Sequence, residues 1–466
     1  MTSLSFNVRQ TCLWIHRYTG LAMAAFLIIT GVTGMLLAFH SELDDMFNHE
    51  LTHIEAQQTP PLSIAALHDK VIATYPKQTF SSMPTSIAPD RAAVFSVDRM
   101  RGPQAKSQPK APFQEVYIDP FSGEIIGTRD KDEWAWRNAM WKVFWLHRDL
   151  LMGDIGKLIL GMVALIWTIN CFIGFYLTFP RALKFSKANQ DIHKKTTRKK
   201  RASFVKRWLP AWKIRRKTNT FKFNYDVHQA FGLWLWLMLL VIAWSSVGFN
   251  LRSVYQPVMQ AAVGLEPREG RPTAKASSEP NSKPEAQTAL KLGRSAEQMN
   301  GADDTLAIIS PFNEPLRDDN IHAHVVTKSN SIAYLSRQAE IAAQENGVSV
   351  QQLLGIRWVD EDEQWQMRFK TDKDIGTHGG ASSITIDAAT GNVARVNFGY
   401  QSSFGNKTDQ WLSTLHMGHI SHGIGHVLYQ IFLALIGLAV AVLSGTGGYL
   451  WWRSRQQRLK ILQKLR

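Results

Sequence analysis

The chain has 466 residues, of which 45% are hydrophobic and 20% charged, and its formal net charge is +15. These averages would suit an ordinary soluble enzyme, but the apolar residues are not spread evenly along the chain. Four windows contain no charged side chain: residues 21–39, 158–180, 230–250 and 427–452. At about 1.5 Å per residue, each window is about long enough to cross a hydrocarbon core of about 30 Å. We therefore predict four transmembrane helices.

The positive charge is concentrated in two places. Sixteen Lys or Arg and one acid lie between Arg181 and Lys222, and the tail from Arg453 to Arg466 has six basic residues and no acid. The rest of the chain has 31 basic and 37 acidic residues, so the high pI reports membrane topology and not a nucleic-acid-binding surface. The positive-inside rule places both basic regions in the cytoplasm. Both termini are then cytoplasmic, and we expect no nucleic-acid partner.

In chain order, the first window is a retained anchor and not a signal peptide, because no small-residue cleavage site follows it. The segments outside the membrane, 41–145 and 253–413, would lie in a periplasm. The two cysteines, Cys12 and Cys171, fall outside both segments, which therefore contain no disulfide. The predicted organisation is as follows: first transmembrane helix 1–40, outer domain 41–145, second helix 146–181, inner loop 182–222, third helix 223–252, outer domain 253–413, fourth helix 414–453, inner tail 454–466.

Each outer segment has the pattern of a small α+β domain. Helical spacing occurs at 63–75 and 332–346, and 355–370 is typical of two strands around an acidic turn. Each segment also ends in a predicted β-hairpin, VYIDPFSGEIIG (116–127) and ITIDAATGNVARV (384–396). The stretch 266–290 is rich in Pro, Ser and charge, which predicts a flexible linker.

The two halves of the chain repeat one plan. The first and third helices begin with HRYTG (16–20) and HQAFG (228–232), and the second and fourth end with GFYL (174–177) and GGYL (447–450). These four short patterns occur in matching order, with an outer segment between each pair of helices. The order predicts an internal duplication of helix, outer domain and helix.

Four histidines occupy matching places in this duplication. His16 and His228 lie at the inner ends of the first and third helices, and His147 and His416 lie near the outer ends of the second and fourth. A buried imidazole without a partner is costly in an apolar bundle. Facing helices could bring each pair together, and two neutral imidazoles on one haem iron would fill both axial positions. The sequence thus predicts two haems at two depths of the membrane.

Other histidines compete for the outer position. His416, His419, His422 and His426 fall on one face of an ideal helix, which would have to break at the outer surface because it exceeds the thickness of the bilayer. The last three could be structural or solvated, could be additional ligands for iron or substrate, or could replace an axial ligand. His40 is a further rival, since it lies 24 residues after His16 at the outer end of the first helix.

The sequence resembles the PepSY-associated transmembrane family, which includes bacterial inner-membrane ferric-siderophore reductases. The resemblance covers nearly the whole chain. It is carried by WIHRYTGL and TGVTG in the first helix, YIDPFSGEIIG, WLHRDLLMGDIG and GFYLTFPR around the second, DVHQAFGLW in the third, and ITIDAATGNV, TLHMG and TGGYLWWR around the fourth.

This resemblance implies a fold and a function. The fold would be an α-helical membrane protein with four transmembrane helices, a haem-binding bundle and two periplasmic α+β PepSY-like domains. His16, His147, His228 and His416 would be the axial ligands of two b haems. Arg17 and Arg148 could pair with haem propionates, or could be ordinary interfacial arginines. The protein would reduce ferric iron or a ferric siderophore in the periplasm. No flavin or nicotinamide fingerprint occurs, so quinol or a cytoplasmic reductase would supply the electrons.

Two other functions compete with this one. A PepSY-type regulator or inhibitor of a periplasmic protease would explain the outer domains but would leave the paired histidines without a role. An iron permease would need carboxylates in the membrane helices, and the four uncharged windows contain none.

Overall fold

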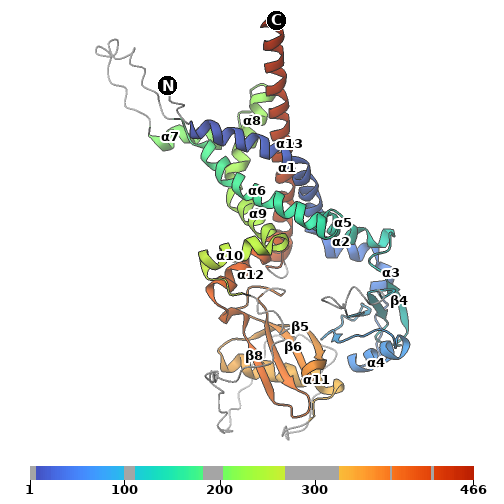
Figure 1. Cartoon of the computed structure of the whole chain (residues 1–466). Coiled ribbons are helices and arrows are strands. Elements are labelled where there is room, and N and C mark those ends of the chain that lie inside the picture. Colours follow the sequence, from blue (N-terminus) through green and yellow to red (C-terminus); the bar gives the residue numbers. More distant parts are fainter. Residues whose placement is uncertain are drawn as a thin grey trace, which may run out of the picture.

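The structure is a computed structural model and describes residues 7–98, 111–181, 203–267, 325–377, 380–420 and 424–465. Long helices form a bundle, and a smaller part with two antiparallel sheets lies at one end of it (Figure 1). The chain is therefore a helical protein with added β-structure. Most of the predicted linker and the first part of the basic inner loop lie outside the described residues.

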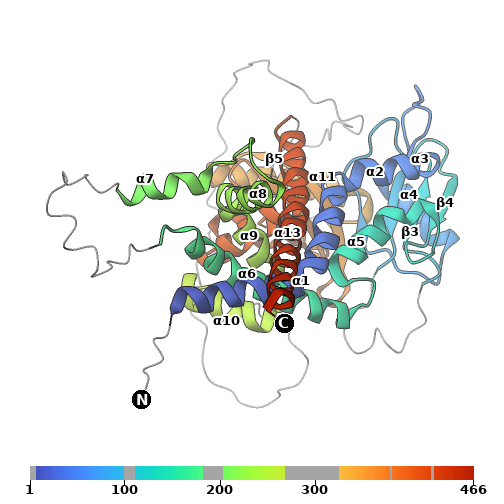
Figure 2. The same cartoon turned by 90° about the horizontal axis from the view of Figure 1, so that it is seen from above.

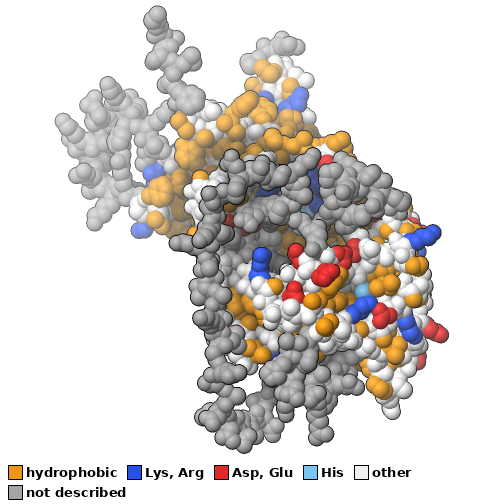
Figure 3. All heavy atoms as spheres, turned by 60° about the horizontal axis from the view of Figure 1, so that its bottom comes forward, with side chains coloured by type: hydrophobic (Ala, Val, Ile, Leu, Met, Phe, Trp, Pro, Cys, Tyr) orange, Lys and Arg blue, Asp and Glu red, His pale blue; other side chains and the backbone are white. Residues whose placement is uncertain are grey.

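Three helices are long and apolar enough to cross a membrane: α1 (Val8–Leu37), α6 (Asp154–Thr178) and α13 (Ile424–Leu465). Each leaves large apolar side chains exposed, and these suit contact with lipid better than contact with water. Figure 3 shows hydrophobic side chains gathered over the helical part, with charged side chains on the part that carries the sheets. The protein is therefore membrane-associated.

The third predicted window, 230–250, is not one straight helix. It falls on α8 (Thr220–Trp234) and α9 (Trp236–Asn250), which meet at Leu235 with a bend of 72°. The bend contains no proline. The indole N–H of Trp236, at the first position of α9, donates to the carbonyl of Cys171 in α6 at 2.9 Å, so a tertiary contact holds the chain where the helix changes direction. The described chain thus has three candidate spans, or up to four if the bent pair counts as one.

The bundle is closely packed where α1 crosses α13, which lies beside it in both views (Figures 1 and 2). A Cβ atom on Gly31 would lie 2.7 Å from the carbonyl oxygen of Gly437, and one on Gly437 would lie 2.6 Å from that of Gly31. Neither residue can therefore carry a side chain without moving a helix. Small residues at such a crossing let helix backbones approach in a membrane, where apolar burial gives little driving force.

A short helix precedes each of the second and fourth spans. The helix α5 (Ala139–Asp149) ends at Leu150, whose φ is 55°, before α6 begins. The helix α12 (Phe404–Met417) ends at Gly418 with φ 81°, before α13 begins at Ile424. The predicted spans 146–181 and 414–453 are therefore each divided into two helices, which allows α5 and α12 to take directions different from the spans that follow.

Antiparallel strands form two sheets beyond the bundle. The smaller sheet has the order β2-β3-β4, and the larger has the order β1-β5-β6-β7-β8. The hairpins predicted at 116–127 and 384–396 are confirmed as β3–β4 and β7–β8, and the strand pair predicted in 355–370 is confirmed as β5–β6. The strand bounds are β1 Ser82–Met83, β2 Ala93–Ser96, β3 Glu115–Ile118, β4 Ile125–Arg129, β5 Val350–Val359, β6 Gln364–Thr371, β7 Ser382–Asp387 and β8 Val393–Asn397.

The two outer segments, treated as separate domains in the sequence, share one core in the structure. Strand β1, from the first half, pairs with β5, from the second half. The predicted helices are confirmed as α4 (Ile64–Thr74) and α11 (Lys328–Glu345), and they contact each other. Fully buried side chains of both halves belong to one hydrophobic cluster, including Leu67 and Phe95 from the first and Leu335 and Met367 from the second. We call this combined part the outer unit.

Short helices connect the outer unit to the bundle. They repeat in the two halves: α2 (His40–Phe47) follows α1 and contacts α5, while α10 (Arg252–Val263) follows α9 and contacts α12. A further short helix, α3 (His49–Thr52), follows α2. The duplication in the sequence is therefore also present in the packing of the short helices.

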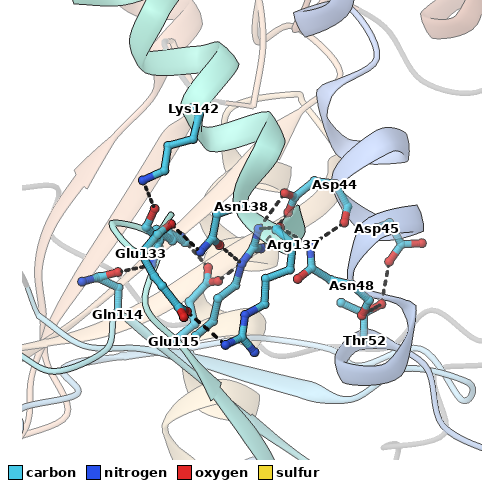
Figure 4. A network of polar contacts seen from close by, with 12 residues as sticks. Asp44, Asp45, Asn48, Thr52, Gln114, Glu115, Glu133, Arg137, Asn138 and Lys142 are labelled. Carbon is cyan, nitrogen blue, oxygen red and sulfur yellow. Dashed lines mark hydrogen bonds and ion pairs between the residues drawn. The ribbon is translucent and has the colours of Figure 1, made fainter. Parts of the chain in front are cut away.

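A buried polar network fixes the first of these connections (Figure 4). At its centre Arg129, at the end of β4, is 2% exposed and donates to both carboxylate oxygens of Asp44 in α2, at 2.7 and 2.8 Å. Arg129 Nε donates to Asn138 Oδ1 at 2.9 Å, and Nη2 donates to the carbonyl of Arg137 at 2.7 Å. The last two residues belong to the 3₁₀ turn Trp136–Asn138, which leads into α5. One side chain therefore ties the small sheet, α2 and the start of α5 together.

Candidate functional site

The structure brings the four matching histidines together as the two pairs that the sequence predicts. His16 of α1 faces His228 of α8, with ring centroids 6.2 Å apart and an angle of 70° between the rings. His147 of α5 faces His416 of α12, with centroids 6.4 Å apart and an angle of 75°. We call these the inner pair and the outer pair. Each pair joins one helix from each half of the duplication.

The separation of the rings suits a single metal ion between them. A metal–imidazole nitrogen bond is about 2.0–2.1 Å, and a five-membered ring with bonds of about 1.33 Å has a radius of about 1.15 Å. Two imidazoles on opposite sides of one metal ion should therefore have centroids about 6.3 Å apart. Edge-on contacts between aromatic rings fall in the same range, so the separation must be judged together with the hydrogen bonds of each ring.

In the inner pair, both Nδ1 atoms bond to acceptors. His16 Nδ1 lies 3.1 Å from Asn170 Oδ1, and the amide nitrogen of Asn170 donates to Thr19 Oγ1 at 2.7 Å, which leaves the amide oxygen to accept from the imidazole. His228 Nδ1 lies 3.0 Å from the carbonyl oxygen of Leu443. A carbonyl or amide oxygen can only accept. Both Nδ1 atoms therefore carry the proton, and both Nε2 atoms have a free lone pair.

In the outer pair, side-chain hydroxyl groups accept the hydrogen bonds from the Nδ1 atoms. Thr33 Oγ1 lies 3.0 Å from His147 Nδ1, and Ser245 Oγ lies 2.7 Å from His416 Nδ1. Each hydroxyl also donates to a carbonyl of its own helix at 2.7 Å, Thr33 to Ile29 and Ser245 to Val241. Its proton is thus used, and it accepts from the imidazole. Such a bond fixes the tautomer and ring orientation of a metal-ligating histidine.

Glycines on neighbouring helices make room for three of the four rings. A Cβ atom on Gly174 would lie 3.1 Å from His16 Cε1, one on Gly447 3.3 Å from His228 Cε1, and one on Gly34 3.1 Å from His147 Cε1. Gly174 and Gly447 are the first residues of the repeated GFYL and GGYL. The repeat therefore has a structural explanation, because these glycines let the inner pair lie against α6 and α13.

The donor set fits haem better than a bare metal ion. No group of three or more His, Cys, Asp or Glu that could hold a metal occurs in the described residues, whereas a structural zinc needs four protein ligands. Two opposed imidazoles leave the equatorial positions to a planar ligand. One turn after His16 and His228, the side-chain positions of Gly20 and Gly232 have no described atom within 4 Å, which leaves space beside each ring.

The two pairs lie at different depths. His16 and Thr33 are both on α1, and Thr33 contacts His147 of the outer pair. Seventeen residues of helix span about 25 Å. The pairs are therefore separated by most of the thickness of a hydrocarbon core of about 30 Å, with the outer pair on the side of the outer unit.

The two predicted arginines differ in their surroundings. Arg148 donates to Asp149 Oδ2 from Nε at 2.9 Å and from Nη2 at 2.5 Å, and it lies over the ring of Phe144. Asp149 is 2% exposed, so Arg148 is already paired with a buried carboxylate. Arg17 is half-buried and forms no ion pair with a described residue. A propionate contact remains a prediction for both.

The described rival histidines lie in different elements of the chain. The break at Gly418 separates His416 from His426, so the predicted common helical face is wrong. His419 lies in the turn after α12, where its N–H donates to the carbonyl of Thr414 at 3.2 Å, and His422 lies outside the described residues. His426 is on α13, with Nδ1 buried and without a described hydrogen-bond partner.

His40 is also placed differently from the prediction. The chain leaves the helix after Leu37, and His40 is the first residue of α2. Its ring lies edge-on against Trp141 of α5 at 5.4 Å, and among the described residues it faces no other histidine.

A small cavity of about 220 Å³ lies next to the outer pair, between α9, α10 and α12. Its lining includes Ser245, which contacts His416, and the ion pair of Arg252 Nη1 with Asp409 Oδ1 at 3.1 Å. The cavity lies below the usual range of about 300–1,000 Å³ for a small-molecule site.

The sequence pointed to the imidazoles but not to their hydrogen-bond partners. Thr33 and Ser245 both follow the inner histidine of their half by 17 residues, so the duplication contained a signal for them. Asn170 has no such counterpart, because the carbonyl of Leu443 performs its role in the second half.

Comparison with known proteins gives one clear result. A search of curated proteins found no match to the chain. The family model described as the PepSY-associated TM region matches residues 13–454, which include both histidine pairs and the described part of the outer unit. The chain therefore belongs to the family of the PepSY-associated transmembrane region.

Proposed function

We propose that this protein is a di-haem electron-transfer protein of the bacterial inner membrane, which reduces periplasmic ferric iron or a ferric siderophore for iron uptake. The observation that carries the proposal is that the four histidines face one another as two pairs, the inner pair and the outer pair. All four rings have a protonated Nδ1 bonded to an acceptor and a free Nε2. A histidine that served packing alone would have no reason to keep Nε2 free, and nothing in packing alone requires four rings to meet as two pairs.

The proposed topology follows from the position of charge. The basic residues of 203–217 and the basic end of α13 lie at the end of the bundle away from the outer unit, and the first and last described residues of the chain lie at that end (Figure 1). Four crossings, with α8 and α9 counted as one broken span, return the chain to its starting side. The positive-inside rule then makes this end cytoplasmic and the outer unit periplasmic.

The residues of the chain would have distinct roles. A bis-imidazole haem accepts and releases one electron and offers no open position for oxygen. His16 and His228 would hold one haem near the cytoplasm, and His147 and His416 would hold the other near the periplasm. Asn170, Thr33 and Ser245 would keep the rings oriented, so that little rearrangement accompanies a change of charge at the metal. Quinol or a cytoplasmic reductase would be the donor at the inner pair.

The chemistry of the substrate explains why reduction would release iron. Fe(III) is held by hard oxygen ligands such as carboxylate, catecholate and hydroxamate groups. Fe(II), with one positive charge less, binds these ligands more weakly. One electron delivered at the face of the outer pair would therefore loosen the chelate, and no bond of the chelator itself would have to break.

Haem content tests the first half of the proposal. Protein purified after haem-replete expression should show a low-spin spectrum that sharpens on reduction, with about two haems per chain by pyridine extraction. His16→Ala or His228→Ala should remove the inner haem, and His147→Ala or His416→Ala the outer one. The matched control is His53→Ala, since His53 stacks on His49 outside the bundle. A colourless preparation, or unchanged haem in all four variants, would refute the assignment.

Reoxidation tests the second half. The reduced protein should be reoxidised by ferric chelates with release of Fe(II), measured by a ferrous chromophore. His147→Ala and His416→Ala should abolish this reaction, and His53→Ala should retain it. If other oxidants reoxidised the haem normally but no ferric chelate did, the protein would still transfer electrons. Its electron acceptor would then not be ferric iron.

A further inference from the structure

The segment from Ser203 to Lys217, here called the basic cap, lies beside the cytoplasmic end of the bundle in the proposed topology. It comprises α7 (Phe204–Trp208), the 3₁₀ turn Leu209–Trp212 and the residues that lead toward α8. It contains no acid, and its basic residues are Lys206, Arg207, Lys213, Arg215, Arg216 and Lys217. In Figure 2, α7 lies to one side of the bundle and the chain runs from there back to α8.

Aromatic side chains attach the cap to the helix that touches His16. The indole of Trp208 donates to Thr178 Oγ1 at 3.1 Å, and its ring lies 6.0 Å from that of Phe175 in α6. Phe175 follows Gly174, which lies against the His16 ring. The cap is therefore attached to α6 close to the point at which this helix contacts His16.

An ion pair attaches the cap to the helix that carries His228. Arg215 donates to both oxygens of Asp226, each at 2.7 Å, and Asp226 is 5% exposed. Asp226 precedes His228 by two residues on α8. Lys213, Arg216 and Lys217 on either side of this tether are exposed, and they form no ion pair with any residue in the described part of the chain. Arg215 thus attaches a stretch with three exposed positive charges to α8, two residues from His228.

From this arrangement we infer that the basic cap docks a small, acidic, soluble one-electron carrier with a flavin or iron–sulfur group. The inference rests on the proposed function. The reduced carrier would give up one electron to the haem iron that His16 and His228 would hold, which would change from Fe(III) to Fe(II), and no proton or chemical group would be transferred. Opposite charges steer such a carrier to the cap, which is attached both to the helix that contacts His16 and to the helix that carries His228.

Anionic lipid headgroups explain only one part of the cap. Phe204, Val205 and Leu209 expose 51%, 61% and 46% of their surface, so α7 with its Lys206 and Arg207 is suited to the membrane interface. The stretch 213–217 is different. Its four basic residues accompany a single apolar residue, Ile214, and it is tied to α8 by Arg215 and Asp226. Positive charge without an apolar anchor favours a soluble acidic partner.

Binding can be measured without any electron transfer. The probe is oxidised flavodoxin, an acidic FMN protein, and the target is the full-length protein in nanodiscs of neutral phosphatidylcholine. The triple variant K213E/R216E/K217E should weaken binding at least about tenfold at low ionic strength, and added salt should weaken wild-type binding. The matched control, R458E/K460E/K464E, makes the same change of charge on the exposed end of α13. Equal losses in both triple variants, or none in either, would overturn the inference.

The rate of haem reduction then tests whether the basic cap serves electron transfer. Haem reduction by reduced flavodoxin should slow at least about tenfold in K213E/R216E/K217E, because steering is lost, while reduction by the uncharged duroquinol should be unchanged. Rapid reduction by duroquinol with none by flavodoxin would overturn the inference and leave the proposed function intact. A protein that binds no haem would instead refute the proposed function. The flavodoxin-binding experiment would still show whether the basic cap is a docking surface.

A lipid role would show itself in the same variants. If K213E/R216E/K217E reduced binding to phosphatidylglycerol vesicles but left flavodoxin binding and flavodoxin kinetics as in the wild type, the stretch 213–217 would be a headgroup site and the inference would be wrong. Weaker binding of flavodoxin in neutral nanodiscs, where no anionic lipid is present, supports the docking surface directly.

Discussion

Ser245 Oγ lies 2.7 Å from His416 Nδ1 and also donates to the carbonyl of Val241 one turn earlier in α9. One hydroxyl therefore fixes both the tautomer and the direction of the imidazole. Thr33 holds His147 in the same way from α1. The outer pair is thus oriented by two side chains that occupy equivalent positions in the duplication, and this relationship can be tested.

Ser245→Ala should weaken binding of the proposed outer haem about 10–100-fold. This is the usual effect of removing the residue that accepts a hydrogen bond from the second ring nitrogen of a metal-ligating histidine. Its neighbour provides a matched control, because Ser246 Oγ donates to the carbonyl of Ile242 in its own helix at 2.8 Å. Ser246→Ala should leave haem content and midpoint potential unchanged. Titration of apo-protein with haem measures both variants, and equal affinity in the two would contradict the role of Ser245.

Gly447→Val should displace His228 and reduce the haem content to about one per chain, because even a Cβ atom at this position would lie 3.3 Å from His228 Cε1 and valine adds two further carbons. Gly445→Val is the control on the same helix, since its side-chain position has no described atom within 4 Å. Pyridine extraction gives the haem content. Retention of both haems in Gly447→Val would show that the glycine is not needed to place the ring.

Arg129→Met should destabilise the outer unit by about 3–5 kcal/mol, because it leaves the carboxylate of Asp44 without its buried partner. Arg137→Met removes a largely exposed ion pair with Glu133 and should cost less than about 1 kcal/mol. Chemical denaturation followed by tryptophan fluorescence measures both. If the two variants unfolded alike, the network around Arg129 would not be what holds the small sheet against α2 and α5.

The outer unit should lose stability below about pH 6.5, the ordinary pKa of histidine. His68 is 5% exposed and its Nε2 bonds to the carbonyl of Phe80 at 2.6 Å; burial lowers the pKa of this imidazole. Between the lowered pKa of the folded state and about 6.5, the unfolded chain binds more protons than the folded one, so stability falls as pH falls. His68→Gln keeps a donor to Phe80 but does not titrate.

Hydrogen exchange of α4 and the strands packed on it, compared at about pH 7.5 and about pH 5 to bracket the histidine pKa of about 6.5, provides the measurement for His68. The wild type should lose protection at the lower pH. His68→Gln should lose less over the same interval. An identical loss in the two proteins would assign the pH dependence to other groups of the outer unit.

Much of the site could be predicted because the duplication repeats its chemistry. His16 and His228, and likewise His147 and His416, occupy equivalent positions that the short patterns of the sequence reveal, and both pairs meet in the structure. The face shared by His416 and His426 was predicted wrongly. A helical wheel assumes an unbroken helix, and Gly418, whose backbone is in the left-handed conformation, ends α12 before that face can form. The bend at Leu235 was missed for a related reason, since no proline marks it.

By itself the sequence determined which segments are apolar enough for lipid, which end of the bundle carries positive charge, and which imidazoles are equivalent, because hydropathy and short spacings are properties of the chain read in order. Only the tertiary structure decided the partners of those imidazoles, the addition of β1 to the larger sheet, and the placement of the basic cap beside the inner pair. His16 meets Asn170 across 154 positions, and Ser245 meets His416 across 171. Contacts over such separations depend on how helices cross, and that depends on close approaches such as the one between Gly31 and Gly437.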